Sequence, residues 1–180
     1  DKEVQDFIGP FSRPSNLLNV ENPETFGAFA LQNYYFEFKK QQQDAMANAM
    51  QVVQDVAKEY EELTGRSYGL IDPYRCDDAD VVIVGLGSTM GTAKQAADDV
   101  REQDGIKAGV LKIRCFRPFP GEMIKNVLAD IPMVGVMDRA LSFGLGGPLF
   151  HEVRSACYGE DGPMKNFIYG LGGRDLSLDE

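Results

Sequence analysis

The sequence predicts an α/β protein with a mainly parallel open sheet and helices on both faces, which is a three-layer α/β/α arrangement. The first observation is an unbroken β-branched run at residues 81–84, typical of a strand buried on both faces. A glycine-rich turn and a helical pattern follow it, and the same succession recurs along the rest of the chain. Four predicted strands alternating with three helices favour a parallel sheet.

The N-terminal third differs from this pattern. Residues 1–32 contain several Gly and Pro turn signals without a sustained periodicity, and therefore predict an extended connector. Its many apolar residues indicate that it docks on this domain or on a neighbour. Residues 33–63 predict one long helix that ends before Gly65. Residues 33–76 would form this helix and a lead-in with a turn at Pro73, and residues 77–180 the α/β domain.

The predicted long helix has an apolar stripe in which residues recur every three or four positions. Core packing is the favoured interpretation, and a partner-binding or coiled-coil stripe is the alternative, because the stripe spans fewer than three heptads. The stripe consists of Met46, Met50, Val53, Ala57, Tyr60 and Leu63.

The strand–turn–helix unit at residues 78–103 begins the α/β domain, and Ser88 or Thr89 is expected to cap its helix. Later strands are predicted at residues 108–114 and 133–137 and from residue 167. Two further helices are predicted at residues 121–129 and 148–158.

Composition limits the classes of function. Of the 180 residues, 28 are acidic and 18 basic, which gives a net charge of −10. This charge disfavours nucleic acid and anionic membranes as partners, because both present phosphates. No apolar run approaches the roughly 20 residues of a spanning helix, and the first residues lack a signal-peptide pattern. We therefore expect a cytoplasmic location. The chain has no initiating methionine, so we expect a fragment or a domain of a longer protein.

The sequence supplies no catalytic constellation of a known pattern. Its three cysteines, at positions 76, 115 and 157, indicate neither a disulfide framework nor a metal knuckle. Cys115 lies between Arg114 and Arg117, whose charges favour a thiolate, but a buried inert thiol is the favoured interpretation. His151, the only histidine, is expected to have a structural or solvent-facing role.

The segment GLGSTMG places glycines at positions 85, 87 and 91. One interpretation is a dinucleotide fingerprint, in which glycines let the backbone approach a pyrophosphate. The spacing departs from GxGxxG, and the next strand ends without the acidic residue that an NAD site requires. Arg114 and Arg117 would instead suit a 2′-phosphate, which keeps NADP as an alternative. A structural glycine turn is favoured.

Polar residues and glycines gather where the predicted strands end. Because the carboxyl ends of parallel strands meet at one edge, ligands or partners are expected there. Gly85, Gly87, Gly172 and Gly173 lie at these ends. The charged candidates for interface or anion contacts are Arg114, Arg117, Asp138, Arg139, Arg174 and Asp175. Ion pairing within the fold or across an interface is favoured, and anion binding is the alternative.

Four ordered segments resemble the C-terminal part of the α subunit of pyruvate:ferredoxin oxidoreductase and related 2-oxoacid:ferredoxin oxidoreductases. These segments are VVIVGLGST, AGVLKIRCFRPFP, MVGVMDRALSFGLGGPLFHEV and FIYGLGGRD. Upstream, ENPETFG and ELTGRSYGLIDPY resemble the same subunit, so that the resemblance covers nearly the whole chain. It implies a transketolase C-terminal-like domain, in agreement with the α/β/α fold predicted above.

The resemblance also implies a function for the intact enzyme. Such enzymes decarboxylate a 2-oxoacid, here expected to be pyruvate, on thiamine pyrophosphate with Mg. They pass electrons through iron-sulfur clusters to ferredoxin and form acyl-CoA, and many act in reverse as synthases. In that family the thiamine cofactor lies between an N-terminal α domain and the β subunit, and cysteine motifs elsewhere hold the clusters.

For this chain the resemblance implies a structural and contact domain that is inactive alone. We expect no catalytic residue, cofactor or metal ligand in it. The loops at residues 114–120, 138–147 and 170–175 are expected to contact other domains or subunits, including the β subunit. An NADP-binding oxidoreductase domain is the alternative function.

Overall fold

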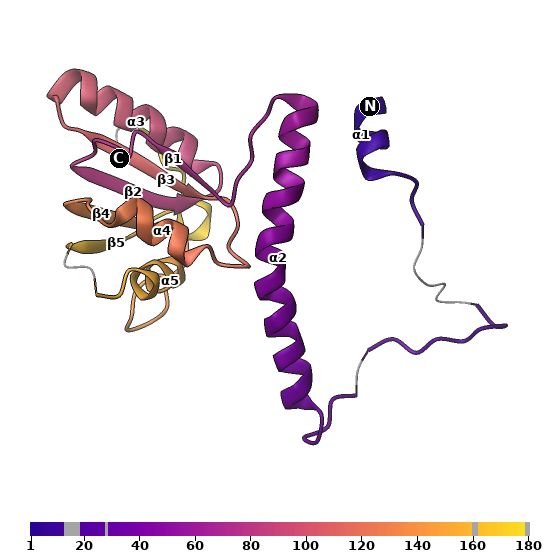
Figure 1. Ribbon diagram of the computed structural model, residues 1–180. Coiled ribbons are helices and arrows are strands. Elements are labelled where there is room, and N and C mark those ends of the chain that lie inside the picture. Colours follow the sequence, from indigo (N-terminus) through magenta and orange to yellow (C-terminus); the bar gives the residue numbers. More distant parts are fainter. Residues whose placement is uncertain (13–18, 28, 160–161, 179–180) are drawn as a thin grey trace. The chain divides into compact units, whose positions relative to one another are not determined.

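The computed structural model describes residues 1–12, 19–27, 29–159 and 162–178. The chain divides into two compact units, unit 1 (Asp1–Ser67) and unit 2 (Tyr68–Glu180). Part of the predicted connector, residues 13–18, lies outside the described residues. Figure 1 shows a long helix as the main element of unit 1 and a helix-covered sheet in unit 2.

Unit 1 begins with a short helix, α1 (Lys2–Ile8), where the sequence predicts an extended connector. That prediction is wrong over these residues, because the turn signals that motivated it start only at Gly9. Gly9 ends the helix with a φ of 74°, a conformation that glycine adopts most readily. The Phe7 ring lies 6.0 Å from the ring of Tyr60 in an edge-to-face arrangement, so this segment contacts the long helix of its own unit.

The long helix α2 (Tyr35–Thr64) confirms the helical periodicity. Gly65 ends it in the left-handed conformation and donates its N–H to the carbonyl of Glu61 at 2.8 Å. No side chain of α2 is fully buried, whereas Met50, Ala57 and Tyr60 of its apolar stripe are half-buried. The interpretation of the stripe as core packing therefore stays a prediction. Periodicity reveals that a helix has an apolar face, but it does not reveal what covers that face.

The five-stranded sheet of unit 2 has the order β1-β3-β2-β4-β5. All neighbours are parallel except β1, which is antiparallel to β3. The parallel strands are β2 (Val81–Leu86), β3 (Ala108–Ile113), β4 (Met133–Asp138) and β5 (Met164–Ile168). Val81–Leu86 contains the β-branched run, and β5 begins three residues earlier than predicted.

The edge strand β1 (Ile71–Tyr74) is absent from the sequence prediction, which has a turn at Pro73. In the structure Pro73 lies opposite Leu111 of β3. An edge strand tolerates proline because one side of its backbone needs no ladder partner. The sheet therefore begins at Ile71, before residue 77, where the sequence places the start of the α/β domain.

Helices cover both faces of the sheet, which confirms the three-layer α/β/α architecture (Figure 1). On one face, Met90 and Ala97 of α3 (Thr89–Asp104) pack on Val110 of β3. On the other face, α4 (Gly121–Leu128) and α5 (Pro148–Ala156) cover β2, β3 and β4. The larger core lies beneath α4 and α5, and Ile124, Leu149 and Val153 are among its fully buried side chains. The short helix η1 (Leu171–Gly173) follows β5.

The glycines after β2 have structural roles. A Cβ atom on Gly85 would lie 2.5 Å from Cε of Met90, so glycine lets this buried methionine pack against the strand. Gly87 has a φ of 74°, which the tight turn into α3 requires. Ser88 occupies the position before the helix, but its hydroxyl forms no capping hydrogen bond. The predicted N-cap position is thus confirmed for Ser88 rather than Thr89, without a side-chain capping hydrogen bond.

Arg101 joins the end of α3 to the loop between β1 and β2. It donates to the carbonyls of Ala108 at 2.6 Å and Arg75 at 2.9 Å, and to Asp78 at 2.8 Å. The hydrogen bond with Arg101 lowers the pKa of Asp78 below its usual value. A lowered folded-state pKa stabilises the fold above the unfolded pKa, and this stabilisation is lost as the pH falls through the folded pKa.

We therefore expect Asp78→Asn to lower the urea midpoint of unit 2 at pH 7 and to have little effect at low pH. The difference in urea midpoint between variant and wild type should shrink as the pH falls below about 4, where the carboxylate of the unfolded chain becomes protonated. It should be lost once the pH is below the lowered folded-state pKa of Asp78. Urea titrations followed by a unit 2 signal between pH 7 and pH 2 would measure this convergence. A constant difference over the whole range would contradict the role of Asp78.

Candidate functional site

The strand-end edge of unit 2 contains all the charged residues that the sequence singles out. The structure divides them into three groups rather than one cluster. Arg114 and Arg117 belong to ion pairs near β1 and α5, Asp138 caps a helix, and Arg139, Arg174 and Asp175 line a cavity.

Arg114 and Arg117 have carboxylate partners within the chain. Arg114 donates to Asp72 of β1 at 2.8 Å and lies over the ring of Tyr68 at 5.2 Å. Arg117 pairs with Glu152 of α5 and lies over the ring of Phe116 at 4.3 Å. These guanidinium groups are already matched by acids, so an NADP site built on them is not favoured.

Asp138 ends β4 and is 4% exposed. Its carboxylate accepts hydrogen bonds from the backbone N–H of Leu149 at 2.8 Å and of Phe150 at 3.0 Å, in the first turn of α5. It thereby satisfies donors that have no partner inside the helix. A third bond, of 2.9 Å, comes from Nδ2 of Asn166 in β5. The geometry makes Asp138 a helix cap.

Sequence reasoning missed Asn166, which connects three segments at this edge. Its Nδ2 donates to the carbonyl of Val136 at 3.1 Å as well as to Asp138, and its Oδ1 accepts from the N–H of Gly147 at 2.8 Å. The signal in the sequence that could have identified Asn166 is a lone asparagine within a short strand, where a polar side chain needs a hydrogen-bond partner.

The loop between β4 and α5 carries apolar side chains that face solvent. Phe143 is 95% exposed and Leu145 72% exposed, and we call these two residues the apolar tip. The base of the loop is ordered, because the N–H of Ser142 donates to the carbonyl of Gly146 at 2.7 Å within a β-bridge. The loop thus presents the apolar tip to solvent on a hydrogen-bonded turn.

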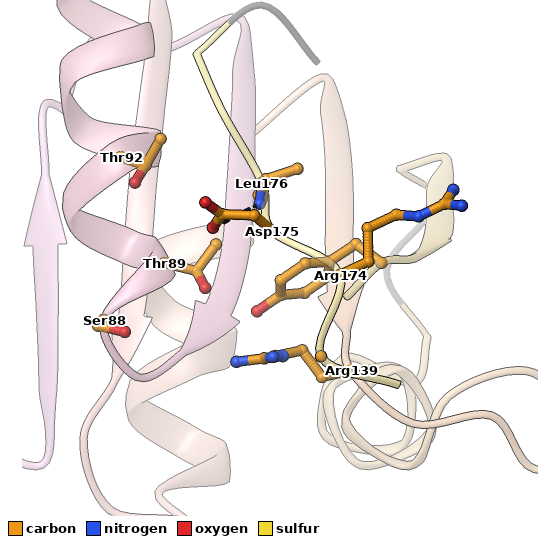
Figure 2. Close-up of a pocket in the computed structure, with 9 residues that line it drawn as sticks. Ser88, Thr89, Thr92, Arg139, Arg174, Asp175 and Leu176 are labelled. Carbon is orange, nitrogen blue, oxygen red and sulfur yellow. Dashed lines mark hydrogen bonds between the residues drawn. The ribbon is translucent and has the colours of Figure 1, made fainter. Parts of the chain in front are cut away.

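A cavity of about 230 Å³ lies between the start of α3 and the segment that follows β5. Figure 2 shows Arg139 reaching from the end of β4 toward Ser88. The lining of this cavity is mostly polar and comes from residues far apart in the sequence: Ser88, Thr89, Thr92, Arg139, Tyr169, Gly173, Arg174, Asp175 and Leu176. We call it the Arg139 cavity. The sequence predicts its Arg139, Arg174 and Asp175. It assigns Ser88 or Thr89 to helix capping and does not single out Thr92 or Tyr169.

The cysteines and the histidine form no shared site in the part of the chain that the structure describes. Cys115 is half-buried, so the expected burial of this thiol is wrong, and its Sγ donates to the carbonyl of Arg117 at 3.3 Å. Cys76 is buried, and this burial raises the pKa of its thiol. The half-buried His151 ring lies 5.5 Å from that of Phe150.

Metal-ligating side chains do not gather among the described residues, which contain no group of three or more His, Cys, Asp or Glu suited to an ion. The donor set therefore does not fit an iron-sulfur cluster or a magnesium site made by this part of the chain alone. Within the described ranges, no helix is both long and apolar enough to cross a membrane.

The mostly parallel five-stranded sheet between two layers of helices makes unit 2 an α/β/α domain. A solved structure with the same fold is 2-oxoglutarate:ferredoxin oxidoreductase from Magnetococcus marinus, determined with 2-oxoglutarate, coenzyme A and succinyl-CoA bound. The TM-score is 0.53 at 18% identity, over 97% of this chain and 28% of that one. Residues 79–180 match the family model of pyruvate:ferredoxin oxidoreductase core domain II. The chain belongs to this family, as its sequence motifs predict.

Curated relatives carry the names of enzyme subunits. Pyruvate synthase subunit PorA of Thermotoga maritima is 46% identical over 178 residues, covering 98% of this chain and 45% of the relative. Ketoisovalerate oxidoreductase subunit VorA of Pyrococcus abyssi is 41% identical over 180 residues, also covering 98% and 45%. The chain therefore spans a little under half the length of these relatives.

Proposed function

We propose that this chain is part of the α subunit of a cytoplasmic 2-oxoacid:ferredoxin oxidoreductase. The complete enzyme would release CO2 from a 2-oxoacid, form acyl-CoA and pass electrons to ferredoxin. Pyruvate is the proposed 2-oxoacid, and the 46% identity with a pyruvate synthase subunit supports this choice. Ketoisovalerate is the competing substrate, supported by the 41% identity with a subunit of that enzyme.

Within that enzyme we assign this chain to structure and to contacts with other domains and subunits, including the β subunit. Thiamine pyrophosphate, Mg and the iron-sulfur clusters would be held by other parts. The observation that carries this assignment is the apolar tip, where Phe143 is 95% exposed on an ordered loop. Exposed apolar side chains on a hydrogen-bonded turn are typical of surfaces that another protein covers.

The apolar tip suits a contact energetically as well as chemically. A loop whose base is already fixed loses little conformational entropy on binding, so more of the burial energy contributes to affinity. The unburied side chains of α2 offer a second apolar surface. The charged loops at residues 114–120, 138–147 and 170–175 would form the polar surroundings of the contact, with Arg117 among their charged residues.

Phe143→Ser in the complete enzyme tests this function. We expect the dissociation constant of the assembled complex to rise by about tenfold or more, because aromatic anchors dominate interface energies. The stability of the free chain should change by less than about 0.5 kcal/mol, since the side chain is exposed. Analytical ultracentrifugation measures assembly. Reduction of ferredoxin with pyruvate and coenzyme A measures turnover, which should be retained once the subunits are saturated.

Tyr158→Ser is the matched control, because Tyr158 is 88% exposed but lies outside the loop. It should leave assembly unchanged. If the Phe143→Ser complex had the same dissociation constant as the wild-type complex, the contact assignment would be contradicted. An enzyme that contains this chain but does not reduce ferredoxin with any 2-oxoacid would sink the oxidoreductase assignment.

A further inference from the structure

We propose that the Arg139 cavity binds the phosphate group of a small hydroxylated molecule, such as a sugar phosphate or the phosphoribose end of a nucleotide. The inference rests on the fold of unit 2 and does not depend on the oxidoreductase assignment. Four features carry it: an arginine without an acidic partner, a ring contact that orients that arginine, a polar lining with hydroxyl groups, and a carboxylate across the cavity.

The first feature is the contrast between Arg139 and the two ion-paired arginines of the edge. Arg114 and Arg117 are neutralised by Asp72 and Glu152. Among the described residues, Arg139 has no ion-pair or hydrogen-bond partner. In a chain with a net charge of −10, such a guanidinium in a polar cavity is a local exception. Its planar fork matches two oxygens of a phosphate.

The second feature is a ring contact that orients the side chain of Arg139. Its guanidinium lies over the Tyr169 ring at 5.9 Å, on the side of the segment after β5. A Cβ atom on Gly170 would lie 2.8 Å from Nε of Arg139, so glycine at this position leaves room for the arginine in its present conformation. A positioned arginine loses less conformational entropy when it binds an anion.

The third feature is the hydroxyl lining toward which the guanidinium of Arg139 extends. Figure 2 shows the guanidinium of Arg139 on the same side of the cavity as Ser88 and Thr89. The Ser88 hydroxyl is not used as a helix cap and therefore remains available as a donor. Hydroxyl groups and a guanidinium that meet around one space supply the hydrogen bonds that phosphate oxygens accept.

The fourth feature, a carboxylate across the cavity, restricts the class of ligand. In Figure 2 the carboxylate of Asp175 points toward Thr89 and Thr92, on the α3 side of the cavity. A carboxylate repels a second anion but accepts hydrogen bonds from hydroxyl groups, so it suits the sugar body rather than the phosphate. The volume of about 230 Å³ is below that of pockets for drug-sized molecules, which favours a small ligand or one end of a larger one.

Titration of the 180-residue chain with inorganic phosphate, ribose 5-phosphate and ADP tests the site by calorimetry or protein NMR. We expect saturable binding, with ribose 5-phosphate at least about fivefold tighter than phosphate because its hydroxyls reach Asp175. If ADP bound more tightly than ribose 5-phosphate, the ligand would be identified as the phosphoribose end of a nucleotide. If ADP bound more weakly, the ligand would be identified as a free sugar phosphate.

Arg139→Gln should weaken ribose 5-phosphate binding by about tenfold or more, since a charge-assisted pair is lost. Arg154→Gln is the matched control: it removes one exposed arginine that does not line the cavity and should leave binding unchanged. Asp175→Asn should tighten phosphate binding and reduce the preference for the sugar. Urea unfolding of each variant establishes that it is folded.

The proposal would be overturned if the wild-type chain bound none of the three probes up to about 10 mM. Equal weakening by Arg139→Gln and Arg154→Gln would also overturn it, because a general charge effect would then account for binding. These titrations involve no other subunit. A failed assembly test with Phe143→Ser therefore leaves this result unaffected, and a failed titration leaves the assembly result unaffected.

Discussion

Replacing Asp138 with alanine is expected to lower the free energy of unfolding of unit 2 by about 3 kcal/mol. The carboxylate is 4% exposed and accepts three hydrogen bonds, two of them from the first turn of α5 and one from Asn166. Alanine would leave the buried N–H of Leu149 without a partner and would leave a small cavity. Both effects act in the same direction.

Urea unfolding of the purified chain measures this loss. Asp138→Asn is the informative comparison, because it keeps the side-chain volume and one acceptor oxygen but removes the charge. We expect it to cost about half as much as alanine, since hydrogen bonds to a charged acceptor are about twice as strong. If Asp138→Ala were less than about 1 kcal/mol destabilising, the capping role would be refuted.

Gly147→Ala is expected to destabilise unit 2 by about 3 kcal/mol or more, or to prevent its folding. An alanine Cβ would lie 2.0 Å from Cγ of Asp138 and 2.3 Å from its Cβ. Asp138 cannot move aside without breaking its three hydrogen bonds. The φ of Gly147 is −84°, which alanine adopts readily, so the effect would be steric rather than conformational.

Gly91→Ala is the control for this substitution. A Cβ atom at position 91 would have no atom within 4 Å, and the residue lies in the first turn of α3. Alanine there should be neutral or stabilise the helix by about 0.5 kcal/mol, because glycine is the weaker helix former. Thermal or urea unfolding compares the two variants. Similar losses at positions 91 and 147 would argue against the steric explanation.

The parallel core of the sheet is predictable from the sequence because its signals are local. The apolar run that begins at Val81 identifies a strand covered on both faces, and the glycines after it identify the turn. Helix α3 then follows from the succession of a turn and polar residues at helical spacing. Each of these signals lies within about 20 residues, so no distant contact is needed to interpret it.

Strand β1 and the surroundings of α2 are not predictable in this way. β1 is four residues long and contains Pro73, and only its pairing with β3 about 40 positions later makes it a strand. The apolar stripe of α2 correctly predicts a helix but not its environment. Helical periodicity is the same whether a face packs in a core, meets a partner or remains exposed.

The candidate site shows the same limit. Strand ends share an edge by topology, so the sequence places the charged residues together on that edge. Their division into ion pairs, cap and cavity depends on partners far away in the chain. Arg114 meets Asp72 across 42 positions and Arg117 meets Glu152 across 35. Neither pairing leaves a trace in local composition, and Arg139 differs from Arg114 and Arg117 only once the partners of those two are known.

The absence of buried side chains in α1 and α2 has a consequence for the cooperativity of unfolding. Cooperative unfolding requires that the loss of one element expose the core of another. Unit 2 has such a core beneath α3, α4 and α5, but the melting of α2 would expose no buried side chain of α2 itself. Circular dichroism at helical wavelengths therefore sums the signal of α2 and that of the helices that cover the sheet. The 30-residue helix contributes a large share of that signal but no fully buried side chain of its own.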